Sequence, residues 1–350
     1  MSYARASDNV QRKADHVWAA LNRDVEFHTV TAGFERYVFH HEALPEINRD
    51  DVDTSVRLFG RRLSMPLIIS SMTGGTAEAS EYNHIFAEAA QRFGLAMGVG
   101  SQRVAVDDPD LEWTFRVRDI APDILLFANI GAIQLNNGYD VDSCARAVEM
   151  IGADALFLHV NPLQECVQSN GNTNFQDLAV KIREVCESSD VPVVVKEVGH
   201  GISARAAGLL ADVGVSGIDV AGAGGTSWSK VESYRSSDAG LVALGSAMSE
   251  WGIPTVDSLM AVRSVAPGLT LIASGGVRSG EDIAKSIALG ADTTGIALPF
   301  LKSAASSRDV IFSHIARLRD ELATVMFCTG SRTVEELHNA PLAKRATGSI

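Results

Sequence analysis

The sequence predicts an α/β fold, a TIM (β/α)8 barrel with an N-terminal extension, on two observations. The first is length: 350 residues exceed the usual single domain, but α/β barrels run larger as one unit, so a second domain is not required. The second is repetition, because short apolar runs alternate with amphipathic stretches from residue 66 onward. The eight strand candidates are PLIISSM, LAMGVGS, ILLFANIG, ALFLHVN, VPVVVKEVG, GIDVAGAGG, LTLIASGG and TTGIALPF.

The spacing of these runs supports the barrel. They begin near residues 67, 95, 124, 155, 191, 217, 269 and 293. A strand–helix–strand unit needs roughly 30 residues, and only the sixth interval, of 52 residues, is much longer. Between strands the helical period appears, with Ile85 and Ala89 on one face of residues 82–93. Gly152 and Gly290 precede strands as glycines at helix ends do. Eight units favour a closed barrel over the alternative, an open doubly wound sheet.

The chain divides into three expected parts. Residues 1–65 form an extension that covers the barrel and contributes substrate-binding residues, residues 66–325 form the barrel, and residues 326–350 form a C-terminal tail that is loosely ordered after Leu337. Within the extension, RKADHVWAAL predicts a short helix, and 34–39 and 54–58 predict strands that cross the barrel floor. The long connection 226–256 suggests a lid or an oligomer contact. Its Trp228 and Trp251, taken as exposed, suggest a homo-oligomer. The expected assembly is a tetramer or an octamer, although these residues do not determine the number of subunits.

Composition excludes several classes of protein. The formal net charge is −13, and no run of five or six like charges occurs, so a nucleic-acid partner is not expected. No stretch approaches the ~18 apolar residues of a membrane span, and the first residues lack an apolar leader segment. The four cysteines show no CxxC pair. These features predict a cytoplasmic protein, and an anionic ligand would need a local cluster of cations.

Polar or glycine residues end most of the apolar runs, where barrel enzymes place their active sites. The strongest signal is SGGVRSGEDIAK after the seventh strand, because paired glycines and a helix N-terminus form an anion-binding site. The alternative is a tight turn that binds nothing. GAGGT, ending at Thr226, provides a second glycine-rich loop. The residues at the strand ends are Thr73, Ser101, Asn129, Asn161, Lys196, Gly222 with Gly224, Gly275 with Gly276, and Leu298.

Three further groups of residues could supply charge or bind a metal ion or an anion. Lys196 ends the apolar run VPVVV, which suggests a fixed cation beside a group that gains negative charge, or else a lysine that reaches the barrel rim. HVNPLQE places Glu165 beside neutral polar groups and is compatible with Mg²⁺ or with a solvated loop. A cationic cluster for a diphosphate would comprise Arg12, Lys13, His16, Arg103 and His159, although the first two also suit a solvated helix face.

Eight motifs in order resemble the type 2 isopentenyl-diphosphate Δ-isomerases, which are flavin-dependent. They are RKADH, SMTGG, GSQR, NIGAIQL, LHVNPLQE, VVKEVGHGIS, GAGGTSW and SGGVRSG, and they run from about Arg12 to Leu301. The resemblance implies a redox-neutral conversion of isopentenyl to dimethylallyl diphosphate. It also implies reduced FMN as the acid/base, Mg²⁺, and NAD(P)H as the reductant of the flavin.

The resemblance also assigns site residues. Those expected to hold FMN are Ser71, Met72, Thr73, Ser101, Asn129, Lys196, Thr226, Gly276, Val277, Arg278, Ala297 and Leu298. Those expected to hold the substrate are Arg12, Lys13, His16, Ser101, Gln102, Arg103, His159, Asn161 and Gln164. Glu165 would carry Mg²⁺, and Gln164, Lys196 and His159 would be catalytic.

Two other functions stay open. An FMN-dependent 2-hydroxyacid oxidoreductase shares the barrel and the phosphate loop, but that family carries His-Gly-x-Arg where this chain reads AGAGGTSW. A non-catalytic flavin-binding barrel would not need RKADH, Gln164 and Glu165. A dehydrogenase of the inosinate type would need a cysteine loop after a strand, and no cysteine lies at a strand end.

Overall fold

Eight parallel strands close into a barrel in this computed structural model, which describes residues 2–345. Around the barrel the strands follow the order β10-β11-β4-β5-β6-β7-β8-β9, so each pairs with its neighbour in the chain and β11 returns to β4. The closed ring confirms the predicted barrel and is incompatible with an open sheet. The strands are β4 (Leu67–Ile69), β5 (Ala96–Gly98), β6 (Leu126–Gly131), β7 (Ala155–His159), β8 (Val193–Lys196), β9 (Gly217–Asp219), β10 (Thr270–Ser274) and β11 (Thr293–Ile296).

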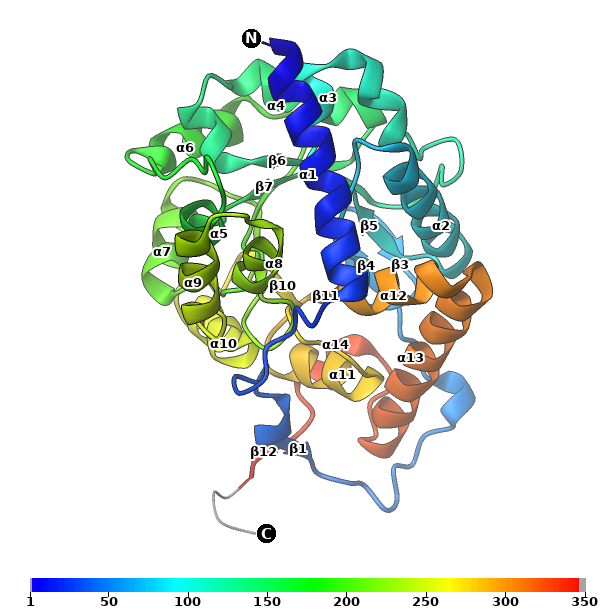
Figure 1. The fold of residues 1–350 in the computed structure, drawn as a ribbon. Coiled ribbons are helices and arrows are strands. Elements are labelled where there is room, and N and C mark those ends of the chain that lie inside the picture. Colours follow the sequence, from blue (N-terminus) through cyan, green and yellow to red (C-terminus); the bar gives the residue numbers. More distant parts are fainter. Residues whose placement is uncertain (1, 346–350) are drawn as a thin grey trace.

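An outer layer of helices surrounds the strands (Figure 1). Local signals fix their ends: the Thr76 hydroxyl accepts from the N–H of Ala79 at the start of α2, and Gly94 ends that helix in the left-handed conformation. Gly152 ends α4 in the same way. The helices are α2 (Ala77–Phe93), α3 (Arg103–Asp107), α4 (Val141–Ile151), α5 (Pro162–Val167), α6 (Leu178–Ser188), α7 (Ala204–Asp212), α8 (Trp228–Arg235), α9 (Ala239–Ala247), α10 (Thr255–Val265), α11 (Gly280–Ala288), α12 (Leu298–Ser306), α13 (Arg308–Cys328) and α14 (Val334–His338).

The floor of the barrel is apolar and closed. Strands β2 (Val56–Leu58) and β3 (Arg61–Leu63) form an antiparallel hairpin whose leucines pack with barrel residues in one buried cluster. In this cluster the rings of Phe127 and Phe157 stack with centroids 4.3 Å apart. Because this end is filled with side chains, a ligand can enter only from the opposite end, where the strands terminate.

The extension crosses the open end of the barrel. Helix α1 (Ser2–Asn22) is longer than the expected short helix, and Figure 1 shows it lying in front of the strands. It contacts α8, α12 and α3. The residues after it, 26 and 27, pair with the loop after β9.

Two expectations for the ends of the chain are wrong. Strand β1 (Tyr37–Phe39) does not cross the floor: it pairs with β12 (Leu342–Lys344), and the Tyr37 hydroxyl lies 3.3 Å from the sulfur of Met260 on the outer helix α10. The same pairing shows that the chain after Leu337 contains a strand, β12, which was expected to be loosely ordered. The short helices η1 (Phe34–Arg36), η2 (Arg49–Asp51), η3 (Pro109–Thr114) and η4 (Ala132–Asn136) complete the architecture.

Among residues 2–345, no helix combines the length and the apolar composition that crossing a membrane requires. The long connection 226–256 folds into α8 and α9, beside the barrel mouth (Figure 1). Helix α8 packs against both α1 and α5. The extension and this connection therefore meet above the strand ends.

Candidate active site

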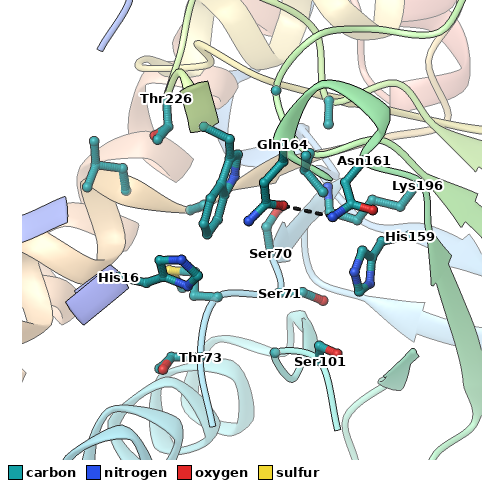
Figure 2. Close-up of a pocket in the computed structure, with 18 of the residues that line it drawn as sticks. His16, Ser70, Ser71, Thr73, Ser101, His159, Asn161, Gln164, Lys196 and Thr226 are labelled. Carbon is teal, nitrogen blue, oxygen red and sulfur yellow. Dashed lines mark hydrogen bonds between the residues drawn. The ribbon is translucent and has the colours of Figure 1, made fainter. Parts of the chain in front are cut away.

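A deep pocket opens at the carboxyl ends of the strands, beneath α1. Its walls come from the loops after the strands, from α1 and from α8. Figure 2 shows His16, Gln164, His159 and Lys196 around this cavity. All of the site residues proposed from the sequence line it except Gln102.

Gln102 is the exception, and its side chain is fully buried away from the pocket. Its Nε2 donates to the carbonyl of Ala147 over 2.7 Å, and its Oε1 accepts from the N–H of Asn129 over 2.8 Å. Both ends of the amide are therefore occupied by backbone. In this structure the side chain of Gln102 therefore braces the strand end that presents Asn129, and substrate binding by Gln102 stays a prediction.

The glycine-rich loops after β9 and β10 approach each other too closely for side chains. A Cβ on Gly225 would lie 2.6 Å from the N of Gly276, and a Cβ on Gly276 would lie 2.6 Å from the carbonyl oxygen of Gly224. Gly276 also has a φ of 73°, which L-residues rarely adopt. The loops thus present bare backbone to the pocket, as an anion-binding site requires.

Unsatisfied hydroxyls lie in the loop after β4. In the described chain, the buried oxygens Ser71 Oγ and Thr73 Oγ1 have no hydrogen-bond partner, although buried polar atoms are normally paired. A polar cofactor such as FMN would satisfy them while its phosphate meets the glycine loops. The residues present therefore fit FMN. Arg278 also reaches the pocket, but its guanidinium pairs with Glu26 of the extension.

Lys196 is not the lone cation that its position suggested. Its Nζ lies 2.7 Å from Asp219 Oδ2, and Ser274 Oγ donates to the other carboxylate oxygen of Asp219. Residues 196 and 219 face each other across the β8–β9 pair. The lysine is therefore held in place by a buried carboxylate, a partner that the sequence argument missed.

Three cations converge where α1 meets the loop after β5. Burial and the nearby guanidinium of Arg103 lower the pKa of Arg12. Burial and the charges of Arg12 and Arg103 lower the pKa of Lys13 to about 7. In the described chain, the buried Nε atoms of both arginines lack acceptors. The positive charges of these side chains repel one another, and a strongly anionic ligand bound among them would remove this repulsion.

A buried carboxylate, Glu232 of α8, links α1 to α5. Its Oε1 lies 2.9 Å from His16 Nε2 and accepts from Gln164 Nε2 over 2.8 Å, while its Oε2 pairs with Arg235. Burial opposes the charge, but the bonds from His16, Gln164 and Arg235 prevail and lower the pKa of Glu232 to about 2. Burial lowers the pKa of His16 despite this contact.

Trp228 also belongs to the site. It lines the pocket, and its ring meets His16 edge-on with centroids 5.1 Å apart. The expectation that Trp228 is an exposed assembly residue is wrong, whereas Trp251 is 65% exposed. No spacing rule signalled Trp228 or Glu232, because α8 lies inside the irregular long connection.

His159 is held neutral. Its Nδ1 lies 2.8 Å from Asn129 Oδ1, an acceptor, so Nδ1 carries the hydrogen and Nε2 is left as an acceptor. Burial, followed by the charges of Lys13, Lys196 and Arg12, lowers the pKa of His159 to about 3. The ring therefore acts as a hydrogen-bonding group and adds no charge to the cationic cluster.

Glu165 is suited to a hard cation that is shared with a ligand. Its Oε2 accepts from Gln168 Nε2 and the N–H of Asn172, and its Oε1 accepts from Asn161 Nδ2 over 3.0 Å. The buried Oδ1 of Asn161 has no partner in the described residues. Since residues 2–345 contain no cluster of three metal-binding side chains, a cation here would need oxygens from a ligand. The set fits Mg²⁺ bound together with a diphosphate.

Comparison with known proteins finds relatives over nearly the whole chain, and those described here share one name. The sequence profile described as FMN-dependent dehydrogenase matches residues 6–107 and 142–344. A protein of Nostoc sp. named isopentenyl-diphosphate delta-isomerase is 50% identical over 99% of each chain. Proteins of the same name are 52% identical in Synechococcus sp., over 94% of each chain, and 47% identical in Rickettsia rickettsii, over 95% of this chain and 97% of that one.

Solved structures share the fold at low identity. A flavocytochrome b2 variant superposes with a TM-score of 0.66 and 19% identity, covering 96% of this chain and 86% of that one. A mandelate oxidase with (S)-2-phenylpropionate gives a TM-score of 0.64 and 18% identity, covering 97% and 98%. At these identities the match concerns the barrel fold alone.

Proposed function

The chain belongs to the isopentenyl-diphosphate delta-isomerases and to the wider family of FMN-dependent dehydrogenases, and from this premise we propose a redox-neutral reaction that uses reduced FMN and Mg²⁺. The enzyme is an isomerase that moves the double bond of isopentenyl diphosphate to give dimethylallyl diphosphate. In this proposal one carbon of the substrate gains a proton and another loses one, with no net transfer of electrons.

One observation carries the proposal: the cluster of Arg12, Lys13 and Arg103 in a pocket of an acidic protein. A single carboxylate, as in a 2-hydroxyacid, would leave most of this charge uncompensated. A diphosphate offers several oxygens to the two guanidinium groups and the ammonium group, and it can also share Mg²⁺ with Glu165. The cluster therefore favours an isoprenoid diphosphate over a hydroxyacid.

The proposed roles at the diphosphate end follow from charge and position. Arg12, Lys13 and Arg103 bind the phosphate oxygens, and Glu165 with the amide oxygen of Asn161 would hold Mg²⁺. Since α1 carries two of these cations, docking of α1 and binding of the diphosphate support each other. The same helix separates the hydrocarbon end from water, because Val17 and Ala20 line the pocket next to Trp228.

At the hydrocarbon end the proposal assigns orientation and proton handling. Reduced FMN, when bound, supplies the acid/base group for proton exchange with the substrate. Lys196, fixed by Asp219, supplies positive charge to the part of the pocket where negative charge develops. Glu232 fixes the amide of Gln164, and neutral His159 accepts a hydrogen bond at Nε2. An unactivated alkene is a weak base, so such positioning is required for proton transfer.

The test uses the flavin-loaded enzyme without oxygen. Enzyme reduced once with dithionite is incubated with isopentenyl diphosphate in deuterated water, with and without Mg²⁺, and the product is followed by NMR. The expected result is deuterium-labelled dimethylallyl diphosphate in large excess over enzyme, only when Mg²⁺ is present. Oxidised enzyme is the control and should be inactive.

The alternatives give different outcomes in the same test. An FMN-dependent 2-hydroxyacid oxidoreductase would not turn over the diphosphate, and it would need an electron acceptor in every cycle with its own substrate. A non-catalytic flavin-binding barrel would give no product at all. Product limited to one equivalent of flavin would contradict a redox-neutral reaction.

The proposal extends to the setting of the enzyme. NAD(P)H is the proposed reductant of the flavin, and the cytoplasm is the proposed location, supported by four cysteines that form no disulfide. Exposed apolar residues such as Trp251 and Leu244 support assembly into a homo-oligomer, for which we propose a tetramer or an octamer. In the proposed division, residues 1–65 supply substrate-binding groups, residues 66–325 bind FMN, and residues 326–350 form the C-terminal tail.

A further inference from the structure

Gln168 lies between the two halves of the proposed diphosphate site. It follows helix α5 directly, lines the pocket and is 6% exposed. On one side its Oε1 accepts from Arg12 Nη1 over 3.5 Å. On the other side its Nε2 donates to Glu165 Oε2 over 2.8 Å. One side chain therefore connects the extension to the carboxylate of the proposed metal site.

The chemistry of the neighbours fixes the orientation of this amide. A guanidinium group has only donors and a carboxylate has only acceptors, so the amide oxygen must face Arg12 and the amide nitrogen must face Glu165. The flipped amide would place donor against donor and acceptor against acceptor. Leucine or methionine could fill the space but could satisfy neither neighbour.

The bond to Glu165 also determines which carboxylate oxygen is available. The backbone N–H of Asn172 donates to the same oxygen as Gln168, Oε2. The other oxygen, Oε1, meets only the side-chain amide of Asn161 among the described residues. Two donors thus hold Oε2, whereas Oε1 accepts one hydrogen bond, from a residue that lines the pocket, and is the less occupied of the two oxygens.

We propose that Gln168 is a positioning residue that sets the metal-binding oxygen of Glu165 and the guanidinium of Arg12 at a fixed separation, so that one diphosphate engages both. This inference rests on the proposed function, since it takes Arg12 as a diphosphate ligand and Glu165 as the Mg²⁺ ligand. It predicts that binding of the metal and binding of the diphosphate are coupled through Gln168.

The first experiment compares Gln168→Met with the wild type as reduced, FMN-loaded enzyme. The expected result is a rise of about tenfold both in KM for isopentenyl diphosphate and in half-saturating Mg²⁺, with kcat within about twofold. A tenfold change corresponds to ~1.4 kcal/mol, close to the value of one hydrogen bond to a charged group. The affinity for FMN should not change.

A matched control exists on the outside of the barrel. Gln91 Nε2 donates to Asp123 Oδ2 over 2.9 Å, which is also an amide-to-carboxylate bond, but neither residue lines the pocket. Gln91→Met should leave both KM and the Mg²⁺ requirement unchanged. If Gln168→Met loses FMN or fails to fold, Gln168→Asn replaces it, because a side chain one methylene shorter keeps the polarity but cannot span both neighbours.

The second experiment is a double-mutant cycle that does not depend on turnover. The Kd of inorganic pyrophosphate is measured by calorimetry at fixed Mg²⁺ for Gln168→Met, Glu165→Gln and the double variant. If Gln168 acts in part through Glu165, Gln168→Met should weaken pyrophosphate binding much less in the Glu165→Gln background than in the wild type. Effects that multiply would overturn the proposal, as would a Gln168 variant that behaves like Gln91→Met.

The results of these experiments distinguish a failure of the proposed function from a failure of the proposed role of Gln168. Wild-type enzyme that fails to isomerise isopentenyl diphosphate contradicts the proposed function. Wild-type enzyme that turns over normally, combined with additive free energies in the cycle, contradicts only the role of Gln168. A fall in kcat alone, with KM and Mg²⁺ requirement unchanged, also contradicts it.

Discussion

Replacing Gly276 by alanine tests the glycine loops as the phosphate site. The added Cβ would lie 2.6 Å from the carbonyl oxygen of Gly224 and 2.8 Å from the Cβ of Ala32. Both contacts are well inside van der Waals distance, and the first is to backbone, so the loop itself must move. The loop after β9, whose Gly225 contacts Gly276, would have to move with it.

The loss of stability expected for Gly276→Ala has two contributions that can be measured separately. A left-handed backbone costs a non-glycine residue roughly 1–2 kcal/mol, and overpacking adds roughly 1–3 kcal/mol. By these two terms Gly276→Ala should lower the free energy of unfolding of the apoprotein by about 2–5 kcal/mol. Gly60 is the control, since its φ is 79° but, apart from its two chain neighbours, no residue of the described chain lies within 4 Å of the point that a Cβ would occupy. Gly60→Ala should cost only the first part, about 1–2 kcal/mol.

The assays are urea unfolding of the apoproteins and fluorescence titration with FMN. Gly276→Ala should raise the Kd of FMN at least about tenfold, because displaced N–H groups no longer meet the phosphate, a loss of ~1.4 kcal/mol or more. Gly60→Ala should bind FMN like the wild type. Equal stability losses in the two variants, together with unchanged FMN affinity in Gly276→Ala, would refute the phosphate assignment.

Three further outcomes are expected. Since the pKa of Lys13 is lowered to about 7 in the ligand-free site, its proton is lost as pH rises through that value, and kcat/KM for the diphosphate should fall above pH 7. Lys13→Arg should flatten this fall. A pH profile that is unchanged in Lys13→Arg would contradict the assignment of the fall to Lys13. Glu165→Gln should keep FMN and raise half-saturating Mg²⁺ at least about tenfold, and wild-type activity at low Mg²⁺ would show that another residue is the ligand. Glu232→Gln should lower kcat about 10–100-fold at unchanged FMN affinity, because a neutral amide with one acceptor oxygen cannot hold His16, Gln164 and Arg235 together as the carboxylate does. Wild-type kcat would exclude this positioning role.

Most of the fold was predictable because each strand carries its own signal. The predicted strand starts lie within two residues of the observed ones, from Leu67 to Thr293. The barrel rule then placed nearly every proposed site residue at one end of the molecule. The β1–β12 pair was not predictable, because it joins residues about 300 positions apart that carry only weak strand patterns.

The missed residues of the site share a physical reason: each depends on long-range placement. Asp219 becomes the partner of Lys196 only through the register of β8 and β9. Glu232 reaches Gln164 because α8 packs against α5, and the long connection has no repeat that predicts this packing. The burial of Gln102 away from the pocket could not be predicted either, because adjacent residues of a turn, here Ser101 and Gln102, point in different directions.

The contact between His16 and Glu232 spans 216 residues of chain. On the ribosome, α1 is among the first segments to emerge, yet its partner α8 is synthesised much later. At about 5–20 residues per second, α1 waits roughly 10–40 s for that partner. During this interval its cationic residues have no pocket to enter. The helix that completes the binding site is therefore made first and docked late, so the nascent chain cannot bind its diphosphate until most of the barrel has been translated.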